Sequence, residues 1–278
     1  MISAKIADGM EFDLLYMTGY GATASYLGLP DAGLATYTDM VGRAGQIARG
    51  TRKPLIADGD TGYGGLLNVQ HTVRGYEAAG VAGIQLEDQV TPKKCGHTLG
   101  RRVVPLADMV MKIKVAAESR ESPDFLIVAR TDARTALGLD EAMRRAEAFA
   151  KAGADILFIE SPESEAEMER IGKAFDLPLL ANMVEGGRTP VLPQARLREI
   201  GYQIAIYPAL GSDARTELAA AIGAKLTGDG CLVVDSHQRT NVAGVYAAGD
   251  ITRSMHNVTF AAADGVTAGM AAHRSLVF

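Results

Sequence analysis

The stretch PLIADGD (54–60) leads from a short apolar run directly into two aspartates. Similar runs recur through the first 208 residues, each followed by polar residues or glycine. Because their apolar residues are nearly continuous instead of alternating, these runs are typical of parallel strands that are buried on both faces. The strands predicted in this way cover 12–19, 54–60, 83–89, 125–133, 156–161, 178–183 and 202–208.

Helical patterns lie between these strands, at 68–80, 107–120, 138–153 and 164–175. Alternating strands and helices predict an α/β fold with a parallel sheet, either open or closed into a barrel. Polar residues at the ends of many successive strands favour the barrel, because an open sheet would concentrate its ligand groups at one switch point. These residues are Asp58, Asp60, Glu87, Asp88, Arg130, Asp132, Glu160 and Asn182.

Composition excludes several classes of protein. The 278 residues are 47% hydrophobic, which is ample for a large core, and the net charge of −5 comes without a dense run of Lys and Arg, so no nucleic-acid partner is expected. No apolar run reaches the ~20 residues that span a bilayer, and three acids in residues 1–17 argue against a signal peptide. The two cysteines, Cys95 and Cys231, are compatible with a reducing compartment, so we expect a cytoplasmic protein.

A pair of aspartates in DGDTGYGG (58–65) indicates a metal site. Asp58 and Asp60 are two residues apart on an extended chain, so their carboxylates lie on the same side, as a hard cation such as Mg²⁺ requires. The alternative is an ordinary glycine-rich loop. Glu87 and Asp31 favour the metal, because four converging acids would repel one another without a cation.

The loop PKKCGH (92–97) combines a thiol, two ammonium groups and an imidazole. Neighbouring cations lower the pKa of a cysteine, which makes Cys95 a candidate acid, base or nucleophile. A free structural cysteine, the alternative, normally has apolar neighbours.

Arg130 ends a predicted strand and can bind a substrate carboxylate with its guanidinium fork, or else form an internal ion pair with Asp132. Asn182 and Glu185 are weaker candidates for substrate binding.

The stretch TGYGATA (18–24), with Asp39 further on, imitates a dinucleotide-binding fingerprint. A true fingerprint leads into a long helix, whereas this one is cut short by GLPDAG. We therefore favour a loop that binds a carboxylate through its backbone amides and the Thr18 hydroxyl.

Six motifs occur in order along the first 208 residues: YMTGYG, LGLPDAGL, ADGDTGYGG, IQLEDQVTPKKCGH, VARTDART and ANMVEGGRTP. Taken together, they resemble the isocitrate lyase / phosphoenolpyruvate mutase family, whose fold is a (β/α)₈ barrel. The KKCGH loop is similar to that of the carbon–carbon lyase branch.

The resemblance implies a role for each matched residue. Asp58 would be the metal ligand, and Asp31, Asp60 and Glu87 would hold Mg²⁺ through water. Thr18, Gly19 and Tyr20 would bind the substrate carboxylate, His97 and Arg130 would bind further oxygens, and Cys95 would be the general acid.

The implied reaction is cleavage of a 2-hydroxy di- or tricarboxylate, of the 2-methylisocitrate or dimethylmalate type, after loss of the hydroxyl proton to Tyr20. Oxaloacetate hydrolysis or decarboxylation and phosphonomutase chemistry are alternatives. The family likeness also implies a homo-oligomer.

Two departures accompany the resemblance. Family members begin with a strand before the helix that resembles ISAKIADGM, so we expect a barrel that lacks its first strand. Residues 209–278 instead resemble the C-terminus of thioredoxin reductase-like flavoproteins, where the Asp of AAGD, here Asp250, contacts the flavin.

A flavin site also needs an N-terminal glycine turn for its phosphates, and the disulfide class needs a C-x-x-C pair; neither motif occurs. We therefore interpret 209–278 as a small α/β fragment without a cofactor site, with strands at 231–235 and 245–250 and a helix at 212–225. The whole chain is then a chimera joined near 207–211. A flavin-dependent oxidoreductase, supported by the tail alone, and an inactive chimera remain the rival interpretations.

Overall fold

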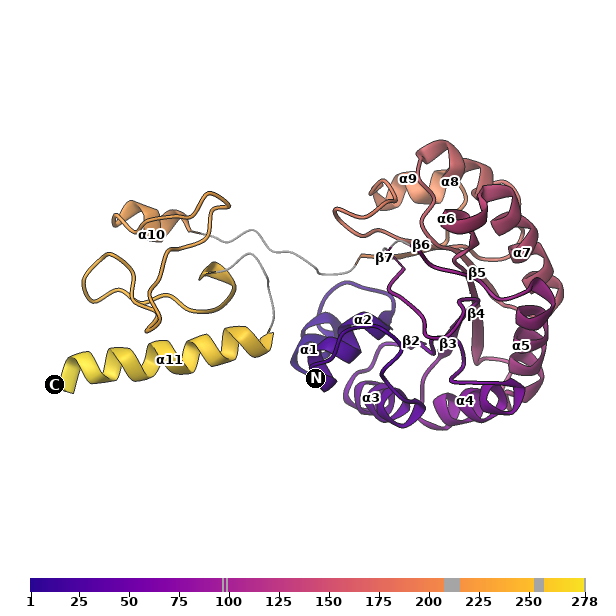
Figure 1. The fold of residues 1–278 in the computed structure, drawn as a ribbon, viewed down its shortest axis with the longest axis horizontal. Coiled ribbons are helices and arrows are strands. Elements are labelled where there is room, and N and C mark those ends of the chain that lie inside the picture. The colour runs from indigo at the N-terminus through magenta and orange to yellow at the C-terminus, as the bar shows by residue number, and fades with distance from the viewer. Residues whose placement is uncertain (97, 99, 208–215, 253–257, 278) are drawn as a thin grey trace. The chain divides into compact units, whose positions relative to one another are not determined.

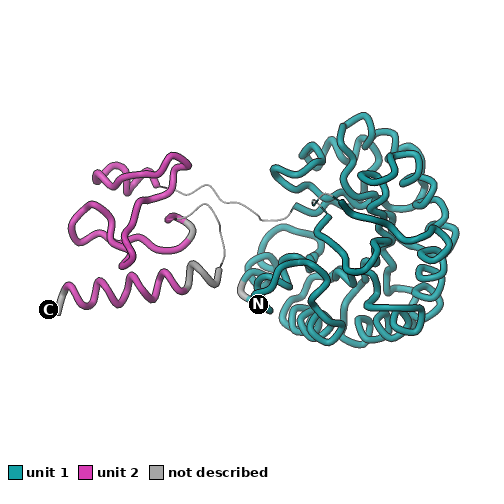
Figure 2. Tube along the Cα trace, in the orientation of Figure 1, with its two compact units in different colours: residues 1–208 teal, residues 209–278 magenta. Residues whose placement is uncertain are grey.

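The structure is a computed structural model that describes residues 1–278 except 97, 99, 208–215, 253–257 and 278. The chain forms two compact units, residues 1–208 and residues 209–278 (Figure 2). Each described unit contains an apolar core of its own.

Unit 1 is built on parallel strands that follow one another in chain order. In the described part of the chain they are β1 Leu15–Met17, β2 Leu55–Asp58, β3 Gly83–Glu87, β4 Leu126–Thr131, β5 Ile156–Ile159, β6 Leu180–Asn182 and β7 Ile204–Ile206. Strands β1 to β5 form one sheet and β6 pairs with β7, with a parallel bridge between Leu157 and Leu179 joining the two sets. Each strand lies inside a stretch predicted from the sequence, so the α/β fold with a parallel sheet is confirmed.

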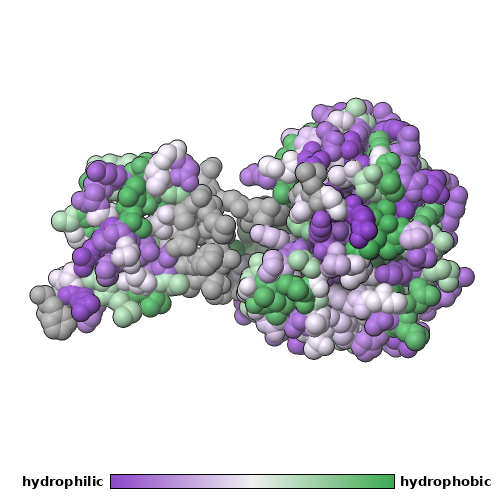
Figure 3. All heavy atoms as spheres, viewed as in Figure 1, coloured by the Kyte–Doolittle hydropathy of each residue, from purple (hydrophilic) through white to green (hydrophobic). Residues whose placement is uncertain are grey.

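Helices surround these strands on the outside (Figure 1). They are α1 Ile2–Asp8, α2 Gly19–Ala22, the π-helix Thr23–Leu27, α3 Tyr37–Gly50, α4 Leu66–Ala78, α5 Leu106–Ser119, α6 Ala133–Leu137, α7 Leu139–Lys151, α8 Glu165–Gly172 and α9 Gln194–Glu199. Local chemistry fixes their starts: Thr36 and Asp39 form a capping box on α3, and the Ser164 hydroxyl accepts a hydrogen bond from the Glu167 amide at the start of α8. On the face of unit 1 that Figure 3 shows, hydrophilic side chains are interspersed with hydrophobic patches.

Apolar side chains cover both faces of the strands. Ile84 and Ile127 face the helices and pack in one large cluster with Tyr76 and Phe149, which are fully buried. Alternate residues point the other way and form a second cluster of Ile56, Val128, Ile156, Phe158 and Leu180. Burial on both faces explains why the strands read as continuous apolar runs. Within the described residues, β1 and β7 each have a strand partner on one side only.

Unit 2 contains α10 Glu217–Ala221, the 3₁₀ helix η2 Gly249–Thr252 and α11 Val258–Val277. The strands predicted at 231–235 and 245–250 are wrong: these stretches form only isolated antiparallel bridges, Leu226 with Leu232 and Arg239 with Tyr246. The reason is that the backbone amides of these stretches donate to carbonyls in turns and in η2, and not to a continuous partner strand. The Leu232 amide, for example, donates to the Ile251 carbonyl.

The predicted helix at 212–225 is shorter than expected, and residues 212–215 lie outside the described residues. The alanine-rich end, for which no element was predicted, forms the 20-residue helix α11. Among the described residues, no helix is both long and apolar enough to cross a membrane.

Candidate active site

Asp58, the last residue of β2, is fixed on both carboxylate oxygens. Its Oδ2 accepts a hydrogen bond from the Gly19 amide at 3.0 Å. Its Oδ1 accepts from the Asp60 amide at 3.0 Å and from Gln85 Nε2 at 3.2 Å. The Tyr16 hydroxyl in turn donates to Gln85 Oε1 at 2.6 Å. Groups from β1, α2 and β3 therefore hold this buried carboxylate in one orientation.

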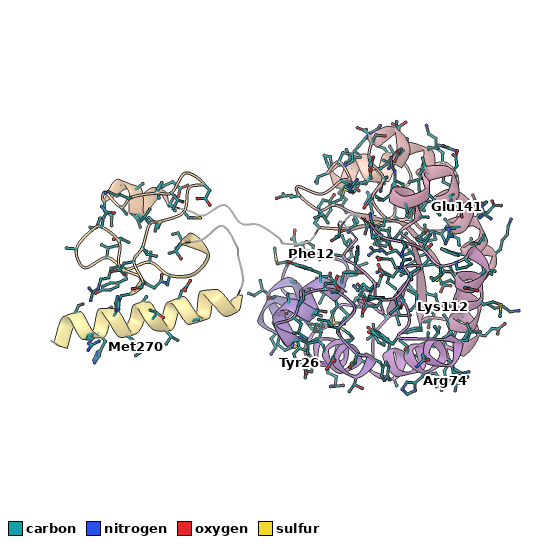
Figure 4. All side chains as sticks on the ribbon, in the orientation of Figure 1. Phe12, Tyr26, Arg74, Lys112, Glu141 and Met270 are labelled. Atoms are coloured by element: carbon teal, nitrogen blue, oxygen red, sulfur yellow. The ribbon has the colours of Figure 1, made fainter. Side chains whose placement is uncertain are left out.

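Asp60 lies in the turn after β2 with a φ of +48°, in the left-handed region that aspartate tolerates better than most residues. Lys112 of α5, labelled in Figure 4, supports this turn: its ammonium donates to the Thr61 carbonyl at 2.7 Å. Burial and the neighbouring charge of Asp58 raise the pKa of Asp60 to about 6.

Lys93 joins Asp60 to Asp31. Its Nζ lies 2.7 Å from Asp60 Oδ1 and 2.6 Å from Asp31 Oδ1, and all three side chains are less than a tenth exposed. Burial disfavours the ammonium charge, but the surrounding carboxylates outweigh it and raise the pKa of Lys93. Asp60 of the glycine-rich turn and Asp31 of LGLPDAG therefore meet at an ammonium group that the chain itself supplies, where the sequence had suggested a metal ion.

Glu87, the last residue of β3, is 1% exposed. Its Oε1 accepts no hydrogen bond from any described residue, and its Oε2 lies 3.6 Å from Arg130 Nε. Burial raises the pKa of Glu87 well above its usual range, although Arg130 acts in the opposite direction.

Arg130, near the end of β4, forms the internal ion pair that the sequence left open. Its Nε donates to Asp132 Oδ2 at 3.0 Å and its Nη2 to Asp132 Oδ1 at 2.9 Å. The same Nη2 lies 3.3 Å from Glu160 Oε2, and the guanidinium carbon lies 5.2 Å from the centre of the Phe158 ring. Arg101 also binds the Asp132 carboxylate. A substrate carboxylate at Arg130 would share the guanidinium with these acids.

The loop that carries Cys95 folds over this ion-pair network. The Gln89 side chain holds the loop at Lys94, donating to its carbonyl at 2.9 Å and accepting from its amide at 3.0 Å. The Ser161 hydroxyl donates to the Gly96 carbonyl at 3.2 Å. A Cβ at Gly96 would stand 2.9 Å from Glu160 Oε2, so this residue has no room for a side chain. Cys95, which is half-buried, directly precedes Gly96 and so lies close to Glu160.

The remaining predicted residues lie at the edge of this cluster or beyond it. Thr18 and Tyr20 are exposed on either side of the buried Gly19. Asn182 ends β6 and donates to Glu160 Oε2 at 3.3 Å, while Glu185 is exposed in the following turn. His97 lies outside the described residues.

TGYGATA forms only the four-residue α2 and a five-residue π-helix, without the long helix of a dinucleotide site. In unit 2, Asp250 belongs to η2.

Asp88, one of the acids predicted at the strand ends, is not part of this cluster. Asp88 accepts hydrogen bonds from the Thr131 hydroxyl at 2.7 Å and from Arg145 of α7 at 2.9 Å. Successive strand residues face opposite sides, so Asp88 turns away from the side of Glu87. Its ion pair connects the sheet to the outer helices.

Sequence reasoning missed the direct roles of Lys93, Arg101, Gln85 and Ser161. A glutamine inside the apolar run GIQLEDQ was a usable signal for Gln85, because a buried amide must find partners. The sequence indicates Lys93 only as a cationic neighbour of Cys95. Its spacing from Asp31 along the chain does not predict that the two side chains meet.

The residues fit a hard divalent cation in chemistry and in charge. The strand ends and the loops beside them bring six buried carboxylates against three buried cations among the described residues of this cluster: Asp31, Asp58, Asp60, Glu87, Asp132 and Glu160 against Lys93, Arg101 and Arg130. Glu87 Oε1 is a buried acceptor without a donor among the described residues. In the present arrangement, however, no three of the described His, Cys, Asp or Glu residues are grouped so that they could hold a metal ion.

Comparison with known proteins shows the family of the chain. The family model described as phosphoenolpyruvate phosphomutase matches residues 1–225. The chain belongs to the phosphoenolpyruvate mutase/isocitrate lyase family. It is 58% identical over 207 residues to a 2,3-dimethylmalate lyase of Eubacterium barkeri, covering 74% of this chain and 72% of that protein. It is 45% identical to a probable 2-methylisocitrate lyase of Corynebacterium glutamicum, covering 74% and 67% respectively.

Solved structures show the same family fold. An oxaloacetate acetylhydrolase in complex with 3,3-difluorooxalacetate has a TM-score of 0.72 and 39% identity, covering 79% of this chain and 74% of that one. A phosphonopyruvate hydrolase with oxalate and Mg²⁺ has a TM-score of 0.66 and 30% identity, covering 80% and 75%. A second family model, pyridine nucleotide-disulphide oxidoreductase, matches residues 188–265, which confirms the predicted resemblance of the C-terminal segment.

Proposed function

We propose that residues 1–208 form a Mg²⁺-dependent carbon–carbon lyase that cleaves a 2-hydroxy di- or tricarboxylate, of the 2,3-dimethylmalate or 2-methylisocitrate type. The observation that carries the proposal is the convergence of Asp58, Asp60 and Glu87 beside Arg130, with the Cys95 loop folded over them. The relatives named for these two substrates support the choice of substrate class.

Asp58, with Asp31, Asp60 and Glu87, would hold the cation, since carboxylate oxygens are the ligands that Mg²⁺ prefers. When bound, Mg²⁺ supplies Lewis-acid stabilisation for the negative charge that develops on the substrate oxygens. The related phosphonopyruvate hydrolase structure, which contains oxalate and Mg²⁺, supports this assignment.

The chain's own groups would carry the binding and the proton transfers. The Thr18–Tyr20 segment, whose Gly19 already contacts Asp58, would bind one carboxylate, and Arg130 would offset carboxylate charge. His97, Asn182 and Glu185 would contact the remaining substrate oxygens.

Tyr20 would accept the hydroxyl proton, the C2–C3 bond would break, and its electron pair would pass into the enolate of the departing acid. The Cys95 thiol would then protonate that carbon, giving a 2-oxo acid and a second carboxylic acid.

For the second unit we propose that residues 209–278 are a fragment of a flavoprotein C-terminus without a cofactor site of its own. Asp250 would contact a flavin only if the rest of such a domain were supplied. We further propose, from the family likeness, that the chain forms a homo-oligomer.

A second candidate is hydrolysis of oxaloacetate on the same residues, favoured by the likeness to the oxaloacetate acetylhydrolase structure. Incubation with 2,3-dimethylmalate, 2-methylisocitrate and oxaloacetate, followed by NMR analysis of the products, separates the two. Pyruvate from either of the first two supports the lyase. Oxalate with acetate from oxaloacetate alone supports the hydrolase, and no product from any of the three would contradict both.

A further inference from the structure

The ammonium of Lys93 lies where the proposed cation would have to bind. Its Nζ is 2.6 Å from Asp31 Oδ1 and 2.7 Å from Asp60 Oδ1, two of the four acids proposed to hold Mg²⁺. The Lys93 side chain is 5% exposed, so the ion pairs are shielded from water and are far stronger than a surface pair. A buried ammonium and a divalent cation cannot both contact these oxygens without strong mutual repulsion.

Lys93 is attached in a way that allows its ammonium to leave. Lysine carries a compact charge at the end of a flexible four-carbon chain. The loop itself is held one residue later, where the Gln89 side chain binds both backbone groups of Lys94. The ammonium can therefore move while the base of the loop stays fixed.

The positions of the acids agree with such an exchange. With Lys93 between Asp31 and Asp60, the described acids are not grouped as a metal site would need them. Glu87, a third member of the set, has a buried oxygen without a donor among the described residues. The acids are thus assembled in one place but are partly neutralised by a side chain of the protein.

We propose that Lys93 is a tethered counter-ion that competes with the divalent cation: its ammonium neutralises Asp31 and Asp60 until the metal binds, and metal binding expels it. The inference rests on the proposed metal site. It assigns Lys93 a role in metal affinity, as a positioning residue that holds the acidic cluster together, and it requires no contact between Lys93 and the substrate.

The test is direct measurement of Mn²⁺ binding, by the loss of the free-ion electron paramagnetic resonance signal, to the full chain and to Lys93→Met and Lys94→Met. Methionine keeps much of the length of lysine without the charge, and Lys94 is an exposed neighbour in the same loop. Lys93→Met should bind Mn²⁺ at least about tenfold more tightly, because the competing charge is gone. Lys94→Met should bind like the unaltered protein.

Equal or weaker binding by Lys93→Met would overturn the inference while leaving the proposed metal site intact. Failure of the unaltered protein to bind Mn²⁺ would instead overturn the metal site itself, and the inference with it. If Lys93→Met does not fold, acetylation of the unaltered protein with acetic anhydride decides. Saturating Mg²⁺ should increase labelling of Lys93 severalfold relative to Lys94, and an unchanged ratio would refute the exchange.

Discussion

The Gly19 amide donates a hydrogen bond to Asp58 Oδ2 at 3.0 Å, and the two residues are so close that a Cβ at Gly19 would stand 2.7 Å from that oxygen. The contact joins the start of α2 to the end of β2, and thus joins the proposed carboxylate-binding loop to the proposed metal ligand. Glycine is required here for close approach, not for an unusual backbone angle.

Gly19→Ala should therefore damage catalysis more than folding. The methyl group pushes the Asp58 carboxylate aside, and a displacement of about 1 Å at a catalytic centre can cost about 100-fold in kcat/KM. Overpacking of this kind lowers the free energy of unfolding by about 1–3 kcal/mol. Gly42→Ala is the matched control, because a Cβ at this exposed position in α3 meets nothing within 4 Å. Equal kcat/KM in the two variants would show that the contact has no catalytic importance.

Cys95→Ser should lower kcat by about 100-fold or more, since removing a positioned general acid typically costs this much. The substitution is nearly isosteric at a half-buried position, so the unfolding midpoint should hardly change. Cys231→Ser, in unit 2, should retain full activity. Steady-state kinetics measures kcat for each variant, and thermal unfolding checks that each is folded. Full activity in Cys95→Ser would show that the thiol is not the general acid.

The strands were predictable because burial on both faces requires a nearly continuous run of apolar residues, as in FLIVARTDA around β4. The strand predicted at 231–235 is wrong for the same reason. An apolar run indicates that residues are buried, but it does not indicate that a partner strand exists. The residues of GDGCLVVD bury Leu232 in a small cluster without joining a continuous ladder.

The site was predictable where its residues sit at the ends of successive strands, since parallel strands bring their carboxyl ends together. Lys93 and Arg101 could not be placed in this way. They come from the loop after β3, and its path over the strand ends depends on contacts such as that of Ser161 with Gly96, which leave no pattern in the sequence.

The raised pKa of Asp60 predicts a specific pH dependence in the absence of metal. Its folded value of about 6 exceeds the unfolded value of 3.8, so ionisation of Asp60 opposes folding at high pH and ceases to do so as the pH falls from about 6 to about 4. Asp60→Asn removes this titration.

With a chelator present, the free energy of unfolding of Asp60→Asn minus that of the unaltered protein should therefore rise between pH 4 and pH 6, by on the order of 2 kcal/mol, and then level off. Urea unfolding at several pH values measures this difference. A difference that does not change with pH would contradict the burial of an ionisable Asp60.

Arg130→Lys should be strongly deleterious although it keeps the charge. The ammonium cannot reproduce the two parallel hydrogen bonds to Asp132, and losing hydrogen bonds to a buried charge costs about 1.5–3 kcal/mol of stability. Arg134→Lys is the control, because its ion pairs with Glu163 and Glu167 are partly exposed and worth about 0–1 kcal/mol. Chemical denaturation that finds equal losses in the two variants would refute the special role of the Arg130 fork.

The measurement that tests the central claim most directly is the formation of pyruvate from 2,3-dimethylmalate in the presence of EDTA and after addition of excess Mg²⁺. Cleavage of the C2–C3 bond of this substrate must give pyruvate and propanoate in equal amounts. We expect both products with Mg²⁺, neither with EDTA, and full recovery when Mg²⁺ is restored. Pyruvate formation that EDTA leaves unchanged would contradict the metal-dependent lyase.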